Sequence, residues 1–276
     1  MHSHIYFLIF ILTASVSFGS LRWQWVETVQ AVEISVLSTE KIIIKKKIKK
    51  RVKPPAREVK GIYLTAYSAG NAKKVDEIVE LINKTELNAV VIDIKDYSGK
   101  VLYDSAVSLA RELSLKENRI GDVRALIRKL HEHDIYVIAR QTVFQDPLLA
   151  ERMPEWAIQS KKGGLWRDNL KLAWIDPTLM NVWDYNVAIA KEAIGYGFDE
   201  INFDYVRFPS DGDLSQVVYT NGAKKKYKIM ADFYHYLSEQ LSKEPAYISL
   251  DFFGFVMERY DGMSIGQRLV DAVDEV

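Results

Sequence analysis

Three successive segments decide the fold of this chain: AVVIDIKD (Ala89–Asp96), IGDVRALIRKLH (Ile120–His131) and IYVIARQTVF (Ile135–Phe144). The first and third are apolar runs of strand length, rich in β-branched residues. In the middle segment apolar side chains recur every three or four residues, which predicts an amphipathic helix. Parallel strands need a crossover of a dozen or more residues, so this strand–helix–strand order predicts two parallel strands.

The same alternation continues on both sides of this unit. Further strands are expected at Gly61–Tyr67, Glu200–Pro209 and Ala246–Phe255. Further helices are expected at Lys73–Lys84, Met180–Ile194, Ala223–Leu241 and Ser264–Val273. The strands are apolar nearly throughout, as in parallel sheets whose faces are both covered. The pattern therefore predicts an α/β architecture.

Two architectures fit this alternation, an open doubly wound sheet and a (β/α)8 barrel. No GxGxxG or GxxxxGK[ST] motif follows any strand, which favours the barrel. No cofactor is expected. Only about five strands precede the end at DAVDEV, so we expect an incomplete TIM-type barrel with unpaired edges. A truncated reading frame and a half-barrel that assembles with itself both remain open.

The first 60 residues differ from the rest of the chain. Ile5–Phe18 is almost wholly apolar but shorter than the roughly 20 residues that cross a bilayer, and small residues follow it. Residues 1–20 are therefore predicted to be a signal peptide or membrane anchor, which implies a secreted or membrane-anchored, extracytoplasmic protein. Residues 21–60, lysine-rich and interrupted by Pro54-Pro55, are predicted to be a linker that is solvated or rests on membrane or cell wall. Residues 61–276 form the predicted barrel domain.

Composition excludes several classes of function. Lys+Arg and Asp+Glu both number 37, so no global field would attract nucleic acid, and we expect no nucleic-acid partner. Cysteine is absent, which excludes disulfides and cysteine nucleophiles. His131 and His133 lack the HExxH spacing, so no metal site is expected. Ser105 and Ser210 lack the GxSxG context of a triad serine.

Charged side chains recur where the predicted strands end. They are Asp93, Arg140, Asp204, Arg207 and Asp251. Catalytic side chains of a barrel project from the C-terminal ends of its strands. These residues are therefore the candidates for a site.

Asp204 is the most informative of them. With a period of two it shares one face with Asn202, while Phe203 takes the opposite face. A carboxylate in so apolar a strand must be paired, protonated or used. Arg207 just beyond would stabilise its ionised form, which suits a nucleophile or an electrostatic stabiliser. An Asp–Arg pair that only ties the strand end to a loop is the alternative.

The next strand repeats this arrangement. Ser249 shares its face with Asp251 and leaves space beside the carboxylate. Two acids from neighbouring strand ends would lie several ångströms apart, as paired carboxylates do when they cleave glycosidic bonds. Whether the configuration would be retained or inverted stays open at this point.

Four stretches of the chain resemble a known family. They are GIYLTAYSAG from position 61, AVVIDIKDYSGKVLYDS from 89, IYVIARQTVFQDP from 135 and DEINFDYVRFPSDG from 199. They are similar to the putative glycosyl hydrolase domain family, related to the α-amylase-like barrels, over roughly Lys60–Val276. The resemblance implies a (β/α)8 barrel that acts on an extracellular or cell-wall polysaccharide. It also implies a nucleophile at Asp204 and an acid/base near Asp251, where amylase-like enzymes usually carry Glu.

Aromatic side chains complete the prediction. Sugar rings stack on such residues, and Trp166 and Trp174 flank a loop expected over the barrel mouth. The predicted substrate-binding residues are Asp93, Arg140, Arg207, Trp166, Trp174 and Tyr205. The open alternatives are a non-catalytic polysaccharide-binding or wall-associated module and an inactive fragment.

Overall fold

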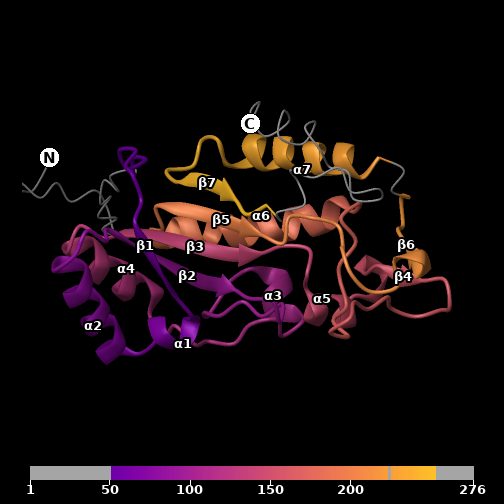
Figure 1. Ribbon diagram of the computed structural model, residues 1–276, viewed down its shortest axis with the longest axis horizontal. Coiled ribbons are helices and arrows are strands. Elements are labelled where there is room, and N and C mark those ends of the chain that lie inside the picture. The colour runs from indigo at the N-terminus through magenta and orange to yellow at the C-terminus, as the bar shows by residue number, and fades with distance from the viewer. Residues whose placement is uncertain (1–50, 223–224, 253–276) are drawn as a thin grey trace, which may run out of the picture. The chain divides into compact units, whose positions relative to one another are not determined.

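The computed structural model describes residues 51–222 and 225–252 (Figure 1). The predicted signal segment, most of the linker and the last predicted helix lie outside these residues.

The centre of the fold is a five-stranded sheet in which all neighbours are parallel. In spatial order its strands are β1 (Gly61–Leu64), β2 (Ala89–Lys95), β3 (Tyr136–Thr142), β5 (Glu200–Asp204) and β7 (Tyr247–Leu250). The order along the sheet follows the order along the chain, so each crossover joins two neighbouring strands. The predicted parallel α/β architecture is confirmed.

Four long helices connect these strands. They are α2 (Ala72–Asn83), α4 (Val123–Glu132), α6 (Met180–Tyr196) and α7 (Lys226–Leu241). The side chain of Asp122 accepts a hydrogen bond from the amide of Ala125, which explains why α4 begins at Val123, later than its apolar pattern suggested. Figure 1 shows α2 and α4 on the side of β1 and β2, and α7 beside β7. Among these and the shorter helices of the described residues, none is long and apolar enough to cross a bilayer.

Short elements that the sequence did not predict lie in the connections. They are α1 (Ala66–Ala69), α3 (Ser108–Glu112), α5 (Pro147–Arg152), η1 (Pro154–Trp156), β4 (Gln159–Ser160), η2 (Leu214–Gln216) and β6 (Val217–Val218). The two-residue strands β4 and β6 pair antiparallel and join the loop after β3 to the loop after β5. Elements this short carry no periodic signal.

The two faces of the sheet differ in what covers them. Ile201 and Phe203 are fully buried in the large apolar core that the helices share with one face. Tyr136 and Ile138 belong to a small separate cluster on the other face. This second face carries the polar residues of β5, because side chains alternate along a strand.

A buried ion pair lies where β2 ends. The register shifts between Asp93 and Lys95, and the fully buried Lys95 Nζ lies 2.8 Å from Asp146 Oδ2. The same ammonium donates to the carbonyl of Thr142 at 2.9 Å. The other oxygen of Asp146 accepts from the amide of Leu149 and caps α5. The pair thus links the ends of β2 and β3 to the start of α5.

Residues 51–60, which the sequence assigned to the linker, contact the N-terminal ends of the strands. The guanidinium of Arg51 donates to the carbonyl of Phe198 at 2.6 Å, just before β5. The hydroxyl of Tyr247, the first residue of β7, donates to the carbonyl of Pro54 at 3.1 Å. This segment therefore crosses the end of the sheet opposite to the predicted site.

Candidate active site

The strand ends bring polar side chains together on the face away from the helices. Strand pairing aligns Asp93 with Arg140, Arg140 with Asn202, and Asn202 with Ser249. Asp204 lies two residues beyond Asn202, so it shares this face, whereas Phe203 packs into the core. The predicted orientation of Asp204, away from the outer helices, is thus what the structure shows.

Arg140 joins two of the candidate carboxylates. Its Nη1 lies 2.7 Å from Asp93 Oδ1, and its Nη2 forms an ion pair with Asp204 Oδ2. Burial alone would lower the pKa of Arg140, but its hydrogen bonds to these carboxylates and their charges outweigh burial and raise that pKa. The guanidinium is therefore a permanent, half-buried cation between β2 and β5.

Asp204 is held by donors at both oxygens. Its Oδ2 accepts from Arg140, and its Oδ1 accepts from the amide of Tyr205 at 2.6 Å. Tyr205 has a φ of 54°, in the left-handed region that non-glycine residues rarely adopt, and the strand ends there. Such backbone conformations cluster at functional sites. The hydrogen bonds from Arg140 and the Tyr205 amide fix the orientation of the Asp204 carboxyl group.

Asp251 has different surroundings. It is exposed, directly follows β7, and its amide donates to the carbonyl of Phe203 at 2.9 Å. Its Oδ1 accepts from Nδ2 of Asn202 at 3.1 Å. A neutral amide thus holds this acid, whereas a cation holds Asp204.

A second layer of polar side chains lies nearer the N-terminal ends of β5 and β7. Ser249 donates to Glu200 Oε1, and Tyr136 donates to Glu200 Oε2 at 3.0 Å. Nδ2 of Asn202 donates to Ser249 Oγ at 3.1 Å and links this layer to Asp251. Glu200 and Tyr136 were not predicted from the sequence. Glu200 could have been found, because Glu200, Asn202 and Asp204 are alternate residues of β5 and share one face.

Tyr63 was also missed. Its hydroxyl donates to Asp93 Oδ2, and the Arg140 guanidinium lies 5.9 Å from the centre of its ring. Burial, the hydrogen bond to Asp93 and the charge of that carboxylate raise the pKa of Tyr63 to about 12. The phenol therefore stays protonated at neutral pH, and 51% of the residue remains exposed.

Arg207 lies three residues beyond the end of β5. The structure shows Arg140 as the ion-pair partner of Asp204, whereas Arg207 Nη1 donates to Ser210 Oγ at 2.7 Å. Its guanidinium also lies 5.3 Å from the ring centres of both Trp174 and Tyr205. Burial lowers the pKa of Arg207. Arg140, on the neighbouring strand β3, thus forms the ion pair with Asp204, and the role expected of Arg207 stays a prediction.

The two predicted tryptophans require a correction. Trp166 is 3% exposed and Trp174 is 2% exposed. The Nε1 of Trp166 donates to the carbonyl of Asp213, and Nε1 of Trp174 donates to Asp168 Oδ2. Both rings are covered by the connecting loops, so they pack the structure and offer no face to a sugar. Tyr205 is half-buried with its ring edge-on to Trp174, at 5.9 Å.

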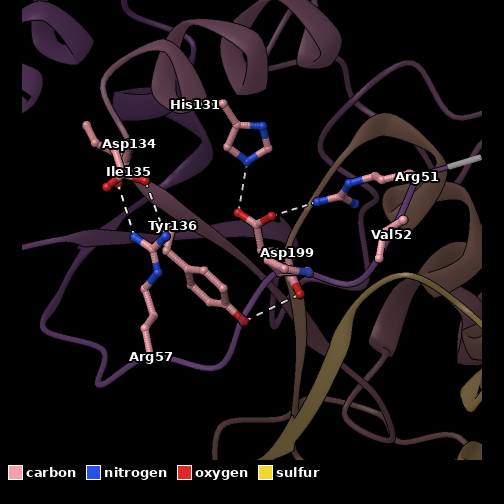
Figure 2. A pocket seen from close by; sticks show the side chains of 9 residues that line it. Arg51, Val52, Arg57, His131, Asp134, Ile135, Tyr136 and Asp199 are labelled. Carbon is pink, nitrogen blue, oxygen red and sulfur yellow. Dashed lines mark hydrogen bonds and ion pairs between the residues drawn. The ribbon is translucent and has the colours of Figure 1, made fainter. Parts of the chain in front are cut away.

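A pocket of about 300 Å³ lies at the N-terminal end of β3 and β5, away from the candidate carboxylates (Figure 2). Asp199 at its wall accepts from Arg51 at 2.6 Å, and Nε2 of His131 lies 2.8 Å from its other oxygen. Arg57 pairs with Asp134 at 3.2 Å. His131 thus takes part in an ion-pair cluster. In the part of the chain that the structure describes, no group of three or more His, Cys, Asp or Glu could hold a metal ion.

Several solved structures resemble this chain, and two of them illustrate the range of similarity. A hypothetical protein from Ruminiclostridium thermocellum is 39% identical, with a TM-score of 0.66 over 71% of this chain and 100% of that chain. The α-L-fucosidase isoenzyme 2 from Paenibacillus thiaminolyticus is 15% identical, with a TM-score of 0.52 over 71% of this chain and 32% of that chain. The second likeness shows the fold alone. No curated protein sequence is significantly similar.

The family model described as "Putative glycosyl hydrolase domain" matches residues 61–276. This range contains every strand of the sheet and all the polar residues gathered at the strand ends. The chain therefore belongs to the putative glycosyl hydrolase domain family.

Proposed function

We propose that this protein is a glycoside hydrolase that cleaves a polysaccharide with Asp204 as nucleophile and Asp251 as acid/base. The observation that carries the proposal is that two acids on the same face of the sheet have different hydrogen-bond partners. Asp204 is held by the cation of Arg140, and Asp251 by a neutral amide. Unlike environments of this kind separate the roles of an acid pair.

The strand register supports a retaining reaction. Asn202 pairs with Ser249, so Asp204 and Asp251 stand at corresponding positions of neighbouring strands. Neighbouring strands lie about 4.8 Å apart. The carboxyl groups of retaining enzymes are about 5 Å apart, and those of inverting enzymes are separated by about 6.5–9.5 Å.

In the first step Asp204 attacks the anomeric carbon while the glycosidic C–O bond breaks. Asp251 gives its proton to the leaving oxygen, so an alcohol departs and a glycosyl ester of Asp204 remains. In the second step Asp251 takes a proton from water as the water oxygen bonds to the anomeric carbon. The ester bond breaks, which regenerates the Asp204 carboxylate and protonated Asp251.

The surrounding residues orient this pair in the proposal. Arg140 holds Asp204 against β3, and Asp93 holds Arg140 from the other side. Tyr63 is a half-exposed ring beside them and a surface on which a sugar can stack. We place the reaction in a (β/α)8 barrel outside the cytoplasm, on an extracellular or cell-wall polysaccharide. That substrate class fits the predicted signal or anchor segment.

Substitution of the two acids tests the proposal. In the full chain, Asp204→Asn and Asp251→Asn should each lower the release of reducing sugar from wall polysaccharides by at least about 10²-fold. Asp232→Asn on the surface of α7 is the matched control. Proton NMR of the first product formed should show the anomeric configuration of the substrate. Undiminished hydrolysis by folded Asp204→Asn would overturn the proposal.

The same variants distinguish a non-catalytic polysaccharide-binding module. Such a module would retain polysaccharides in a pull-down by wild type and both variants, and would release no product. The pairing of Arg140 with Asp204 would then serve only to structure the binding face.

A further inference from the structure

We propose that Asn202 is a positioning residue that directs the acidic proton of Asp251 to Oδ2. This inference rests on the proposed function, in which Asp251 is the acid/base. Asn202 lies on β5, on the same face as Asp204, and its side chain reaches across to β7. It forms no part of the bond-making pair itself.

The hydrogen-bond donors of Asn202 are directed to two acceptors. Its Nδ2 donates to Ser249 Oγ and to Asp251 Oδ1, each at 3.1 Å. An amide NH₂ has two hydrogens, so both are used. A proton on Asp251 Oδ1 would make this oxygen a poorer acceptor and so weaken the hydrogen bond from Asn202. The protonated acid therefore carries its hydrogen on Oδ2.

The layer below fixes which way the Asn202 amide faces. Ser249 donates its only hydroxyl hydrogen to Glu200 Oε1, so its oxygen is left as an acceptor towards Asn202. Tyr136 donates to the other oxygen of Glu200. Turning the amide over would set its carbonyl oxygen against Ser249 Oγ, whose only hydrogen is already donated to Glu200, so two acceptors would face each other. The hydrogen bonds that Tyr136 and Ser249 donate to Glu200 therefore determine that Asn202 donates to Asp251.

This arrangement matters most for leaving groups that need a proton. With Asn202 in place, the transferable hydrogen stays on one oxygen and the carboxyl group on β7 cannot rotate freely. Without it, the proton is shared between both oxygens and the carboxyl plane turns. Proton donation by a positioned acid contributes about 10²–10⁴-fold, and loss of its orientation should remove about tenfold of that.

The test compares leaving groups in the full chain. Asn202→Ala should lower kcat about tenfold on the natural polysaccharide, with KM changed less than twofold. On the 4-nitrophenyl glycoside of the released sugar, whose leaving group departs without a proton, kcat/KM should change less than twofold, because kcat/KM reports only the first step and not the later attack of water. Asn83→Ala, an exposed asparagine at the end of α2, is the matched control. A purely structural role would lower both activities equally, and that outcome would overturn the inference.

Two further variants keep the test decisive if Asn202→Ala fails to fold. Ser249→Ala removes the acceptor that holds the Asn202 amide, and should reproduce a weaker form of the same leaving-group dependence. Asn202→Asp places a second carboxylate beside Asp251, so the alkaline limb of the pH–rate profile should move to higher pH. An unmoved limb and equal losses on both substrates would contradict the inference.

Failure of the inference and failure of the proposed function look different. Wild-type rates of hydrolysis for Asp204→Asn and Asp251→Asn would remove the proposed catalytic pair, on which the inference rests. Loss of activity in those two variants together with wild-type behaviour of Asn202→Ala on both substrates would remove only the role of Asn202.

Discussion

Arg140 is the residue on which the geometry of the acid site depends most directly, because it contacts Asp93 and Asp204 through different nitrogens. A lysine carries a compact charge and cannot span two carboxylates in this fork geometry. Arg140→Lys should therefore lower kcat by about 10–100-fold, since the nucleophile would lose its fixed orientation.

Steady-state kinetics on a polysaccharide that the wild type hydrolyses would measure this effect. Arg128→Lys, on the exposed side of α4, provides the control for a change of cation alone. A variant at Arg140 with wild-type kcat would show that a point charge suffices to hold Asp204.

At the residue scale the sequence predicted carboxylates better than aromatics. Asp204 and Asp251 could be placed because alternation along a strand decides which side chains share a face. Trp166 and Trp174 could not, since their burial depends on how two loops pack together, and no local pattern contains that information. Tyr63 was missed because a tyrosine within an apolar strand looks like a core residue.

The connection between β2, β3 and α5 depends on the ion pair of Lys95 and Asp146, both fully buried. Lys95→Met would leave Asp146 charged without its partner in the core. Breaking one side of such a pair costs about 3–5 kcal/mol. We expect urea denaturation monitored by circular dichroism to show that the free energy of unfolding falls by this amount.

Two comparison variants define the cause of this loss. Lys74→Met, at an exposed pair on α2, should change the free energy of unfolding by less than about 1 kcal/mol. Lys95→Met combined with Asp146→Asn should recover part of the stability, because asparagine keeps the cap of α5 without the charge. If the double variant is no more stable than Lys95→Met, the unpaired charge of Asp146 is not the cause of the lower stability of Lys95→Met.

At the element scale, long periodic segments were predictable and short ones were not. All four long helices lie where the apolar periodicity predicted them, with ends shifted by caps such as Asp122. The strand predicted at Glu200–Pro209 ends earlier, at Asp204, because Tyr205 turns the backbone into the left-handed region. The pair of β4 and β6 depends on contacts between distant loops, which a local pattern does not contain.

The whole molecule should lose stability in alkaline solution. Burial raises the pKa of several tyrosines above the ordinary value of 10, and these are Tyr103, Tyr136, Tyr185, Tyr219 and Tyr234. Below pH 10 both the folded and unfolded states hold these protons. Above pH 10 the unfolded state releases them and the folded state does not, so stability falls as pH rises.

Unfolding in urea at pH 8 to 11.5 measures this trend. Each such tyrosine steepens the decline by about 1.4 kcal/mol per pH unit. Tyr234→Phe should flatten the decline above pH 10, and Tyr97→Phe, an exposed tyrosine, should leave it unchanged. An equal slope in wild type and Tyr234→Phe would contradict the assignment.

At the scale of the whole chain, the parallel α/β architecture followed from alternating strand and helix patterns alone. The absence of phosphate-binding motifs favoured the barrel over an open sheet, and closure into a barrel stays a prediction. The contacts of residues 51–60 could not be predicted, because their lysines and prolines resemble those of a solvated spacer.

Those contacts have a practical consequence for handling the protein. Arg51 and Pro54 meet the sheet at the starts of β5 and β7, whereas Asp204 and Asp251 stand where the same strands finish. A bead or sensor chip coupled at Arg51 should therefore leave the carboxylates of Asp204 and Asp251 facing the bulk solution. Soluble glycans flowed over such a surface would reach the carboxylates without passing the support.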